Sequence, residues 1–456
     1  MKKIVSILIL TLVISNISML SNAKVFATSP PPYISAYAAI LIDATTGQVL
    51  FEKNMHELLE PASTTKVMTA LLALEHLELD QVITIDPISP FIGGSRIFVI
   101  EGEELTVEEL LYATMLTSAN DASVALAIAI SGSVEAFADL MNERAREAGA
   151  RWPMYVNPSG LHSPGHFATA YDLAVVAMDA MRNPTFRQIV STVQFTIPET
   201  NMQPERDYIH NTNRMLFDRN MTVPVNGNLR PVMFEGTTGI KTGTTPQAGA
   251  TLVASAERDG TEFITVVLGT TDPLRYGYTI ALLEFGFDNF FTHKAVDASV
   301  ELEEVAIRRG TVNRVAVEIL EDRHITLPIQ ASVALINTEI VIDENIQAPI
   351  EVGQVLGRVE IFEGSDLIGD VPIVATESIE EGRFLSRFGI DDSTSAIIRV
   401  VLIVLGVIIG LLVTAYLVIT IWYELRKRAR RKAKIQKLIE EREAKEKEAA
   451  QREWPF

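Results

Sequence analysis

The sequence predicts an α+β domain, a small all-β domain after it and a transmembrane helix near the C-terminus. In residues 34–292, strand-like segments at both ends enclose a series of helical segments, which indicates one sheet packed against helices. In residues 294–379, short β-rich segments are separated by segments that contain Gly, Asp and Asn. Residues 400–422 contain no charged side chain and are long enough to cross a ~30 Å hydrocarbon layer as a helix.

The first domain should begin with a β-hairpin over residues 37–54, because apolar and polar residues alternate there around a turn that contains Gly47. Apolar residues at helical spacing then predict a series of helices, over residues 63–77, 107–115, 119–130, 134–148 and 171–181. Strands are expected next, at residues 239–242, 250–255 and 262–268, with a last helix at 278–285.

The second domain is expected to be a set of short strands, at residues 300–305, 315–319, 333–336, 339–342, 359–362 and 371–374. No constellation of His, Asp and Ser side chains occurs in this part of the sequence, so a structural or positioning role is expected for it. Residues 380–399 contain Glu, Ser and Asp and are expected to link it to the membrane helix.

The N-terminal residues 1–27 have the pattern of a secretory signal peptide. Lys2 and Lys3 precede a mostly apolar run, and small-residue cleavage sites end at Ala23 or Ala27. The alternative is an uncleaved membrane anchor. The shortness of the apolar run favours the cleaved signal peptide.

The other end of the chain indicates its orientation in the membrane. Trp422 and Tyr423 close the apolar segment, where amphipathic rings favour the interface, and a basic run at 426–432 follows at once. Because cationic flanks stay on the cytoplasmic side, residues 28–395 are expected outside the cytoplasm and residues 423–456 inside. A buried core helix is the alternative reading of the apolar segment, but it gives no reason for the basic run.

Charge and cysteine content exclude several function classes. Residues 28–423 contain 24 Lys and Arg against 51 Asp and Glu, whereas residues 424–456 contain 12 against 7. The acidic bulk argues against nucleic acid as a partner. The chain has no cysteine, which removes a Cys nucleophile, a thiolate metal site and a disulfide framework.

Ser63 and Lys66 form an S-x-x-K motif at the start of a predicted helix. Residues three apart share a helix face. Serine needs an adjacent base, and a lysine whose pKa is lowered by burial and by a neighbouring cation can serve as that base. The motif alone is weak evidence, since Ser21 and Lys24 form a second copy in the signal region, and Ser63 taken alone is explained as a helix cap.

A second motif, Ser118-Ala119-Asn120, lies at another predicted helix start. Its functional interpretation is that Ser118 passes protons between Lys66 and the leaving group. Asn120 would hold Lys66 and a substrate amide. Ser and Asn are also common helix caps, so this motif alone means little.

The third motif is Lys241-Thr242-Gly243, which occurs once and lies on a predicted strand. Lys241 would add positive potential, and Gly243 would leave room for a substrate backbone along the strand. Thr242 or Thr244 could bind a terminal carboxylate, and a strand amide with the Ser63 amide could form an oxyanion hole. The three motifs, in this order and on these elements, favour a serine acyl-transfer enzyme over a surface strand and two helix caps.

The motifs and the segments around them resemble the D-alanyl-D-alanine carboxypeptidases, which are low-molecular-mass penicillin-binding proteins. The resemblance extends from about residue 35 to residue 376, and Ala119 replaces the glycine usual in the second motif. Many relatives carry His at position 244, so Thr244 bears on pH dependence or substrate preference. Arg275 falls where the family often has an arginine that helps to bind the substrate carboxylate. The matching segments are 61–69, 118–122, 157–161, 168–174, 239–245, 248–249, 347–354 and 368–375.

The resemblance implies a penicillin-binding-protein or β-lactamase-like catalytic domain that needs no cofactor and no metal. Its substrate would be a peptidoglycan stem peptide ending in D-Ala-D-Ala. Ser63 would attack the carbonyl between the two D-alanines, and β-lactam antibiotics would acylate the same serine. Family members often attach to the membrane by an amphipathic helix, whereas this chain has a full span and a basic tail.

Other interpretations stay open at this point. A D,D-transpeptidase or endopeptidase of the same fold would use the same motifs, and so would a β-lactamase, although the E-x-x-L-N pattern is absent between the second and third motifs. A non-catalytic cell-wall-binding or signalling relative is the alternative from another class. A zinc site at His162 and His166 is weaker still, because Pro164 and Gly165 break their helical spacing and no H-E-x-x-H occurs.

Overall fold

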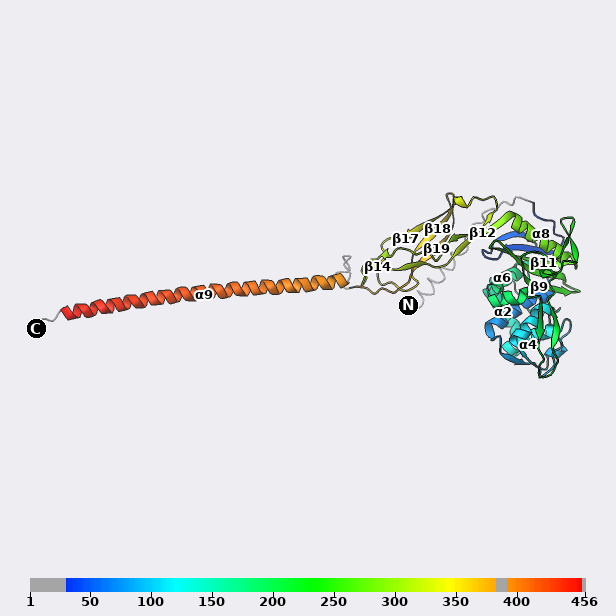
Figure 1. Ribbon diagram of the computed structural model, residues 1–456, viewed down its shortest axis with the longest axis horizontal. Coiled ribbons are helices and arrows are strands. Elements are labelled where there is room, and N and C mark those ends of the chain that lie inside the picture. Colours follow the sequence, from blue (N-terminus) through cyan, green and yellow to red (C-terminus); the bar gives the residue numbers. More distant parts are fainter. Residues whose placement is uncertain (1–29, 383–391, 453–456) are drawn as a thin grey trace. The chain divides into compact units, whose positions relative to one another are not determined.

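The computed structural model describes residues 30–382 and 392–452 (Figure 1). The expected signal peptide and part of the expected linker lie outside these residues. The chain divides into two compact units. Of the described residues, the first unit contains 30–297, 322–339 and 360–370, and the second contains the others.

A five-stranded antiparallel sheet forms the centre of the first unit, with the strand order β2-β1-β11-β10-β9. Alternate residues of a strand point to opposite faces. In agreement with this, Ile40 and Ile42 pack into one apolar core, whereas Ala39 and Leu41 pack into another on the other face. The strands are β1 (Ala38–Asp43), β2 (Val49–Lys53), β9 (Thr237–Thr245), β10 (Gly249–Arg258) and β11 (Thr261–Thr270).

Helices cover both faces of this sheet, so the predicted α+β class is confirmed. Helix α8 packs on β10 and β11 in the smaller core, and α6 packs on β1 and β11 in the larger one. Strand β9 lies at an edge, so one side of the strand that carries the third motif is unpaired within the sheet. The helices are α2 (Lys66–His76), α3 (Val107–Tyr112), α4 (Asn120–Ser131), α5 (Val134–Glu147), α6 (Ala170–Met181), α7 (Pro184–Ser191) and α8 (Leu274–Asn289).

Two predicted helices have irregular ends next to the motifs. The helix expected over residues 63–77 begins as a 3-10 turn, η1 (Ala62–Thr65), before α2. The helix expected over 107–115 ends in a π-helical segment, η3 (Ala113–Thr117), and Ser118 then adopts a left-handed conformation with φ of 64°. Irregular helix segments of this kind are frequent at functional sites.

Short elements that were not predicted complete the first unit. Helix α7 is only two turns long, and the small hairpins are too short to show a clear period. These hairpins pair β3 (Val82–Thr84) with β4 (Glu104–Thr106), β5 (Gln194–Ile197) with β6 (Arg206–His210), and β7 (Thr222–Val225) with β8 (Asn228–Pro231). The 3-10 turns η2 (Ser89–Phe91) and η4 (Arg214–Leu216) lie in the connections.

The segment from residue 290 to residue 382 is built from strands, as predicted. Its largest sheet has the order β15-β19-β18-β17. The expected strand at 333–336 was wrong, because this segment forms the 3-10 turn η5 (Val333–Leu335), and only Val305 of the strand expected at 300–305 is in a strand. The strands are β12 (Phe290–Val296), β13 (Val305–Ala306), β14 (Arg314–Val315), β15 (Val317–Ile319), β16 (Arg323–Pro328), β17 (Ile336–Ile342), β18 (Val355–Glu363) and β19 (Asp366–Ala375).

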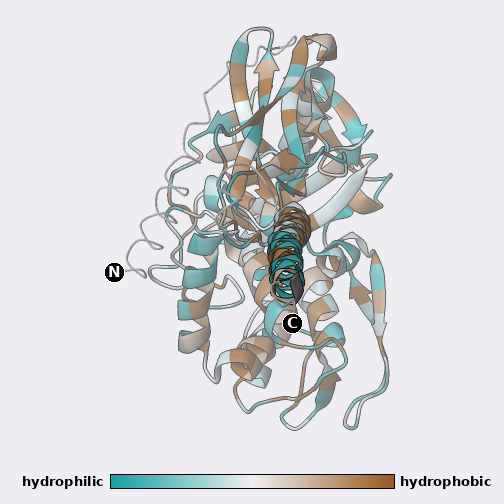
Figure 2. Ribbon diagram, turned by 90° about the vertical axis from the view of Figure 1, so that its left-hand side faces the viewer, coloured by the Kyte–Doolittle hydropathy of each residue, from teal (hydrophilic) through white to brown (hydrophobic). Residues whose placement is uncertain are grey.

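Helix α9 (Asp392–Arg452) is a single helix of 61 residues (Figure 1). Its most apolar 18 residues have a mean hydropathy of 3.1 and none of them is buried, so the helix is a candidate membrane span. Figure 2 shows its residues change from hydrophobic to hydrophilic toward the C-terminal end. Within the described residues, the bent pair α4 and α5 is together also long and apolar enough to cross a membrane, but α4 is buried in the larger core.

The buried carboxylate of Asp43 ties the end of β1 to two other segments of the first unit. It accepts hydrogen bonds from the backbone N–H groups of Thr45 at 2.8 Å and Thr46 at 3.0 Å. It also accepts from the hydroxyls of Thr292 at 2.7 Å and Thr326 at 2.8 Å. This one side chain therefore satisfies four donors.

We expect Asp43→Ala to lower the free energy of unfolding by about 2–4 kcal/mol, because it removes the acceptor of one buried and three part-buried donors. Thermal unfolding of the full chain in detergent measures this. Thr45→Ala is the control, since the exposed Thr45 contributes only its backbone N–H to the cluster. If the free energy of unfolding of Asp43→Ala lies within about 0.5 kcal/mol of the parent value, the Asp43 carboxylate does not have this stabilising role.

Candidate active site

The turn that carries Ser63 is held in an unusual backbone conformation. Ala62 has φ of 51°, in the left-handed region that costs a residue with a Cβ about 1–2 kcal/mol. The Pro61 carbonyl fixes the turn, accepting hydrogen bonds from the hydroxyls of Thr64 at 2.7 Å and Thr251 at 3.1 Å. Thr251 belongs to β10, so the central sheet itself sets the position of Ser63. Such outliers are often found at functional sites.

The Lys66 amine lies at the junction of three segments. Its Nζ is 3.0 Å from Ser63 Oγ, 2.7 Å from Asn120 Oδ1 and 2.7 Å from the carbonyl oxygen of Ser159. The side chain is completely buried. Burial, and then the charge of Lys241, hold the pKa of Lys66 well below its usual value, while Asp121 acts in the opposite direction.

This arrangement suits a neutral amine that accepts the proton of Ser63. Asn120 Oδ1 and the Ser159 carbonyl are acceptors, so they take the two N–H bonds of a neutral Lys66. The lone pair that remains then faces the Ser63 hydroxyl at 3.0 Å, which is within the reach required of a general base.

Asn120 is oriented for this contact by its own surroundings. Its Nδ2 donates to the Gly93 carbonyl at 2.7 Å, which turns Oδ1 toward Lys66. Ser118 lies two residues earlier, is 7% exposed, and its hydroxyl makes no hydrogen bond within the part of the chain that the structure describes. Its expected part in proton transfer therefore stays a prediction.

Gly243 brings strand β9 against the Ser63 turn. A Cβ at this position would lie 2.9 Å from the Ser63 backbone nitrogen and 2.3 Å from Thr251 Oγ1. The missing side chain therefore makes room for the turn. As a result, the Ser63 amide and the edge of β9 lie close together, which is where an oxyanion hole is expected.

Lys241 and Arg275 place two further cations along β9. Lys241 is 1% exposed, and its Nζ donates to the Thr242 carbonyl at 3.1 Å. Burial, and then the charge of Arg275, lower the pKa of Lys241 to about 7. Thr242 contacts the hydroxyl of Thr212 at 2.7 Å.

The end of β9 is held by Arg275 from α8. The Arg275 Nη1 donates to the Gly243 carbonyl at 3.0 Å and to Thr244 Oγ1 at 2.9 Å, while Nη2 contacts Asp272 at 3.1 Å. Arg275, and Lys241 in its charged form, make this edge positive. A site of this kind suits a substrate that carries a carboxylate.

The Ser159 carbonyl was not identified from the sequence. The segment 157–161 was noted only for its resemblance, and a backbone oxygen leaves no sequence signal. Asn157 supports it, because its Oδ1 accepts from the backbone N–H groups of Ser159 at 3.1 Å and Gly160 at 2.8 Å.

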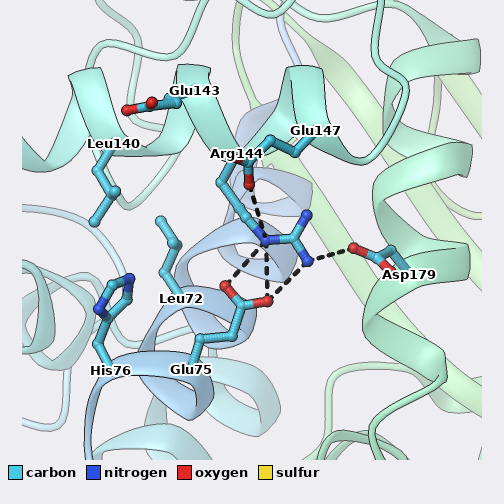
Figure 3. A pocket seen from close by; sticks show the side chains of 8 residues that line it. All are labelled: Leu72, Glu75, His76, Leu140, Glu143, Arg144, Glu147 and Asp179. Carbon is cyan, nitrogen blue, oxygen red and sulfur yellow. Dashed lines mark hydrogen bonds and ion pairs between the residues drawn. The ribbon is translucent and has the colours of Figure 1, made fainter. Parts of the chain in front are cut away.

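A separate hollow of about 680 Å³ lies at the far end of α2 (Figure 3). There Arg144 contacts Glu75 at 2.8 Å and Asp179 at 2.5 Å, which joins α5 to α2 and α6. Glu75 follows Lys66 by nine residues, or about 13 Å along a helix. The hollow is therefore distinct from the motif site.

The two histidines considered for zinc have separate partners. His162 Nδ1 is 2.9 Å from Glu60, whereas His166 is buried and bonded to Thr65 and Val156. In the described parts of the chain, no three His, Cys, Asp or Glu side chains are grouped so as to hold a metal ion.

Comparison with known proteins agrees with the motifs. A family model described as D-alanyl-D-alanine carboxypeptidase matches residues 24–272, and a model described as penicillin-binding protein 5, C-terminal domain, matches residues 290–381. The D-alanyl-D-alanine carboxypeptidase DacF of Bacillus subtilis is 32% identical over 77% of this chain and 87% of its own length.

Solved structures share the fold as well. Penicillin binding protein 5 from Haemophilus influenzae matches with a TM-score of 0.63 and 29% identity, over 77% of this chain and 100% of that chain. A mutant of a Streptomyces DD-transpeptidase matches with a TM-score of 0.50 and 30% identity, over 56% and 99%. The chain therefore belongs to the D-alanyl-D-alanine carboxypeptidase family of serine-type enzymes.

Proposed function

We propose that this protein removes the terminal D-alanine from peptidoglycan stem peptides through an acyl-enzyme on Ser63, and that β-lactams acylate the same residue. The observation that carries the proposal is the contact of Lys66 Nζ with Ser63 Oγ. Two acceptors, Asn120 Oδ1 and the Ser159 carbonyl, contact the same amine and fix its direction. The family membership supports the substrate class.

The reaction follows from this arrangement. Ser63 Oγ attacks the carbonyl between the two D-alanines and its proton passes to Lys66. The Ser63 amide and the edge of β9 stabilise the oxyanion. The proton then returns through Ser118 to the leaving amine, the C–N bond breaks, and water hydrolyses the acyl-enzyme.

The terminal carboxylate of the substrate would lie at the end of β9. Thr242, Thr244 and Arg275 supply its hydrogen bonds, and Lys241 supplies positive potential. A β-lactam acylates Ser63 by the same attack. Its leaving group stays tethered, which blocks the water and makes the adduct long-lived.

Peptide transfer is the second candidate function. The Streptomyces structure named a DD-transpeptidase has the fold of this catalytic region. The two functions differ only in whether water or an amine attacks the acyl-enzyme. Release of D-alanine from a pentapeptide, compared with transfer to an added amine, distinguishes them.

We expect penicillin to form a covalent adduct on Ser63, because this hydroxyl is the one that Lys66 contacts. Peptide mass spectrometry of the penicillin-treated chain locates the adduct. Ser63→Ala should abolish it, whereas Ser365→Ala, in an exposed turn, should not. An intact chain without any adduct on Ser63 would overturn the proposal, and rapid turnover of penicillin would instead indicate a β-lactamase.

The rate of acylation should depend on pH through both lysines. Lys66 acts as a base when neutral, so the rate rises as pH increases through its lowered pKa. Lys241 attracts the substrate carboxylate when charged, so the rate falls as pH rises through about 7.

Lys241→Arg should therefore remove the fall in rate above about pH 7, since arginine stays charged. Acylation rates with a fluorescent penicillin, measured from about pH 5 to about pH 10, test this. Lys53→Arg, on β2 at the opposite edge of the sheet, is the control. If the acylation rate of Lys241→Arg still falls at alkaline pH, the charge of Lys241 does not cause that fall.

We also propose that α9 crosses the membrane, with the catalytic unit outside the cytoplasm and the basic tail inside. The uncharged segment 400–422 and the basic run that follows it support this orientation. The proposal puts Ser63 on the side of the membrane where the cell-wall peptides lie.

The absence of cysteine from the chain makes this orientation directly measurable. In protoplasts with an intact membrane, a membrane-impermeant maleimide should label Ser365→Cys, which lies in an exposed turn. It should label Ala449→Cys, on the exposed tail of α9, only after permeabilisation. The reverse pattern would contradict the orientation.

A further inference from the structure

The imidazole of His166 joins two segments that meet at Lys66. The ring is 2% exposed. Its Nδ1 is 3.0 Å from the backbone nitrogen of Val156, and its Nε2 is 2.9 Å from Thr65 Oγ1. A backbone N–H can only donate, so Nδ1 is the acceptor and the ring proton on Nε2 is donated to Thr65.

Both partners of His166 are directly connected to the Lys66 contacts. Thr65 immediately precedes Lys66. Val156 begins the segment 156–161, which we call the site loop, and its Ser159 carbonyl accepts from Lys66 Nζ at 2.7 Å. The contacts form a closed circuit from Lys66 through the site loop and His166 back to Thr65.

The site loop lies directly against the nucleophile turn. A Cβ on Gly160 would come within 1.8 Å of the Ala62 carbonyl oxygen and 2.8 Å of Thr65 Oγ1. Thr69 Oγ1 donates to the Pro158 carbonyl at 2.6 Å. Because the two segments are this close, a shift of the loop would change the Lys66 to Ser159 contact.

The ring is suited to a fixed structural connection. Burial, and then the charge of Lys66, lower the pKa of His166 to about 4, so the ring is neutral at ordinary pH. A second ring proton would also point at the Val156 N–H and break that hydrogen bond.

We propose that His166 is a positioning residue for acylation, which holds the Ser159 carbonyl against Lys66 Nζ and so directs the Lys66 lone pair at Ser63. This inference rests on the proposed function of Ser63 and Lys66. His166 itself touches no reacting atom.

Two substitutions separate the ends of the connection. In His166→Asn, the Oδ1 of the introduced asparagine replaces the ring Nδ1 and keeps an acceptor for the Val156 N–H. In His166→Gln, the Nε2 of the introduced glutamine replaces the ring Nε2 and keeps a donor for Thr65. His166→Phe keeps the ring shape and removes both hydrogen bonds.

The experiment measures the acylation rate constant and the dissociation constant for penicillin separately, on the full chain in detergent. His166→Phe should lower the rate constant about 10- to 100-fold and change the dissociation constant by less than about threefold, because misplacement of a catalytic group affects the chemical step. His166→Asn should recover part of the rate constant, since the site loop keeps its hydrogen bond. His162→Phe, on the same segment of chain but bonded to Glu60, should acylate like the parent.

The amplitude of acylation counts the folded sites, so loss of folded protein is distinguished from a slower step. Should His166→Phe not fold, Thr65→Val removes the other end of the same connection and should slow acylation in the same way. Normal rate constants in the folded variants would overturn the role of His166 alone. Absence of acylation in the parent would overturn the proposed function with it.

Discussion

The buried amine of Lys66 is the constraint on which the rest of this site depends. A charged amine without water or an anion is costly to bury, so its pKa falls and the neutral form becomes accessible. A neutral amine is useful only if its lone pair points at the nucleophile. Asn120 and the Ser159 carbonyl supply the two acceptors that set this direction. Three segments of chain, on α2, α4 and the site loop, must therefore meet to within hydrogen-bond distance.

Several irregular backbone conformations allow these segments to come together around Lys66. The left-handed Ala62 lies in the turn before α2, and the left-handed Ser118 lies in the turn before α4. Glycines at 160 and 243 allow the site loop and β9 to approach the Ser63 turn more closely than any residue with a side chain would allow. The regular sheet and helices around them form two large apolar cores, which hold these unfavourable conformations in place.

The sequence predicted the fold class and the long apolar helix near the C-terminus, because both depend on periodic or continuous apolar patterns. It also predicted that Ser63, Lys66 and Asn120 act in one site, because motifs are made of side chains, whose identity and order can be read directly from the sequence. It did not identify the Ser159 carbonyl or His166. The first is a backbone atom. The second lies in a loop without any period, where the sequence indicated it only as a weak zinc ligand with His162. The irregular helix ends were missed for a related reason, since the apolar spacing of η1 and η3 resembles that of an α-helix.

The positive charges beside β9 favour a substrate that ends in a free carboxylate. Lys241 lies on β9 and Arg275 contacts the end of this strand. Burial, and then the charge of Arg275, lower the pKa of Lys241 to about 7. Within the described residues, the Lys241 amine hydrogen-bonds only the Thr242 carbonyl, and the carboxylate that contacts Arg275 is the half-exposed Asp272. The site thus has more positive charge than its own side chains balance. A peptide with a free terminal carboxylate supplies the missing negative charge and favours the charged form of Lys241, whereas an internal peptide bond supplies none. On the proposed function, this imbalance favours cleavage of a terminal residue over cleavage within a cross-linked peptide.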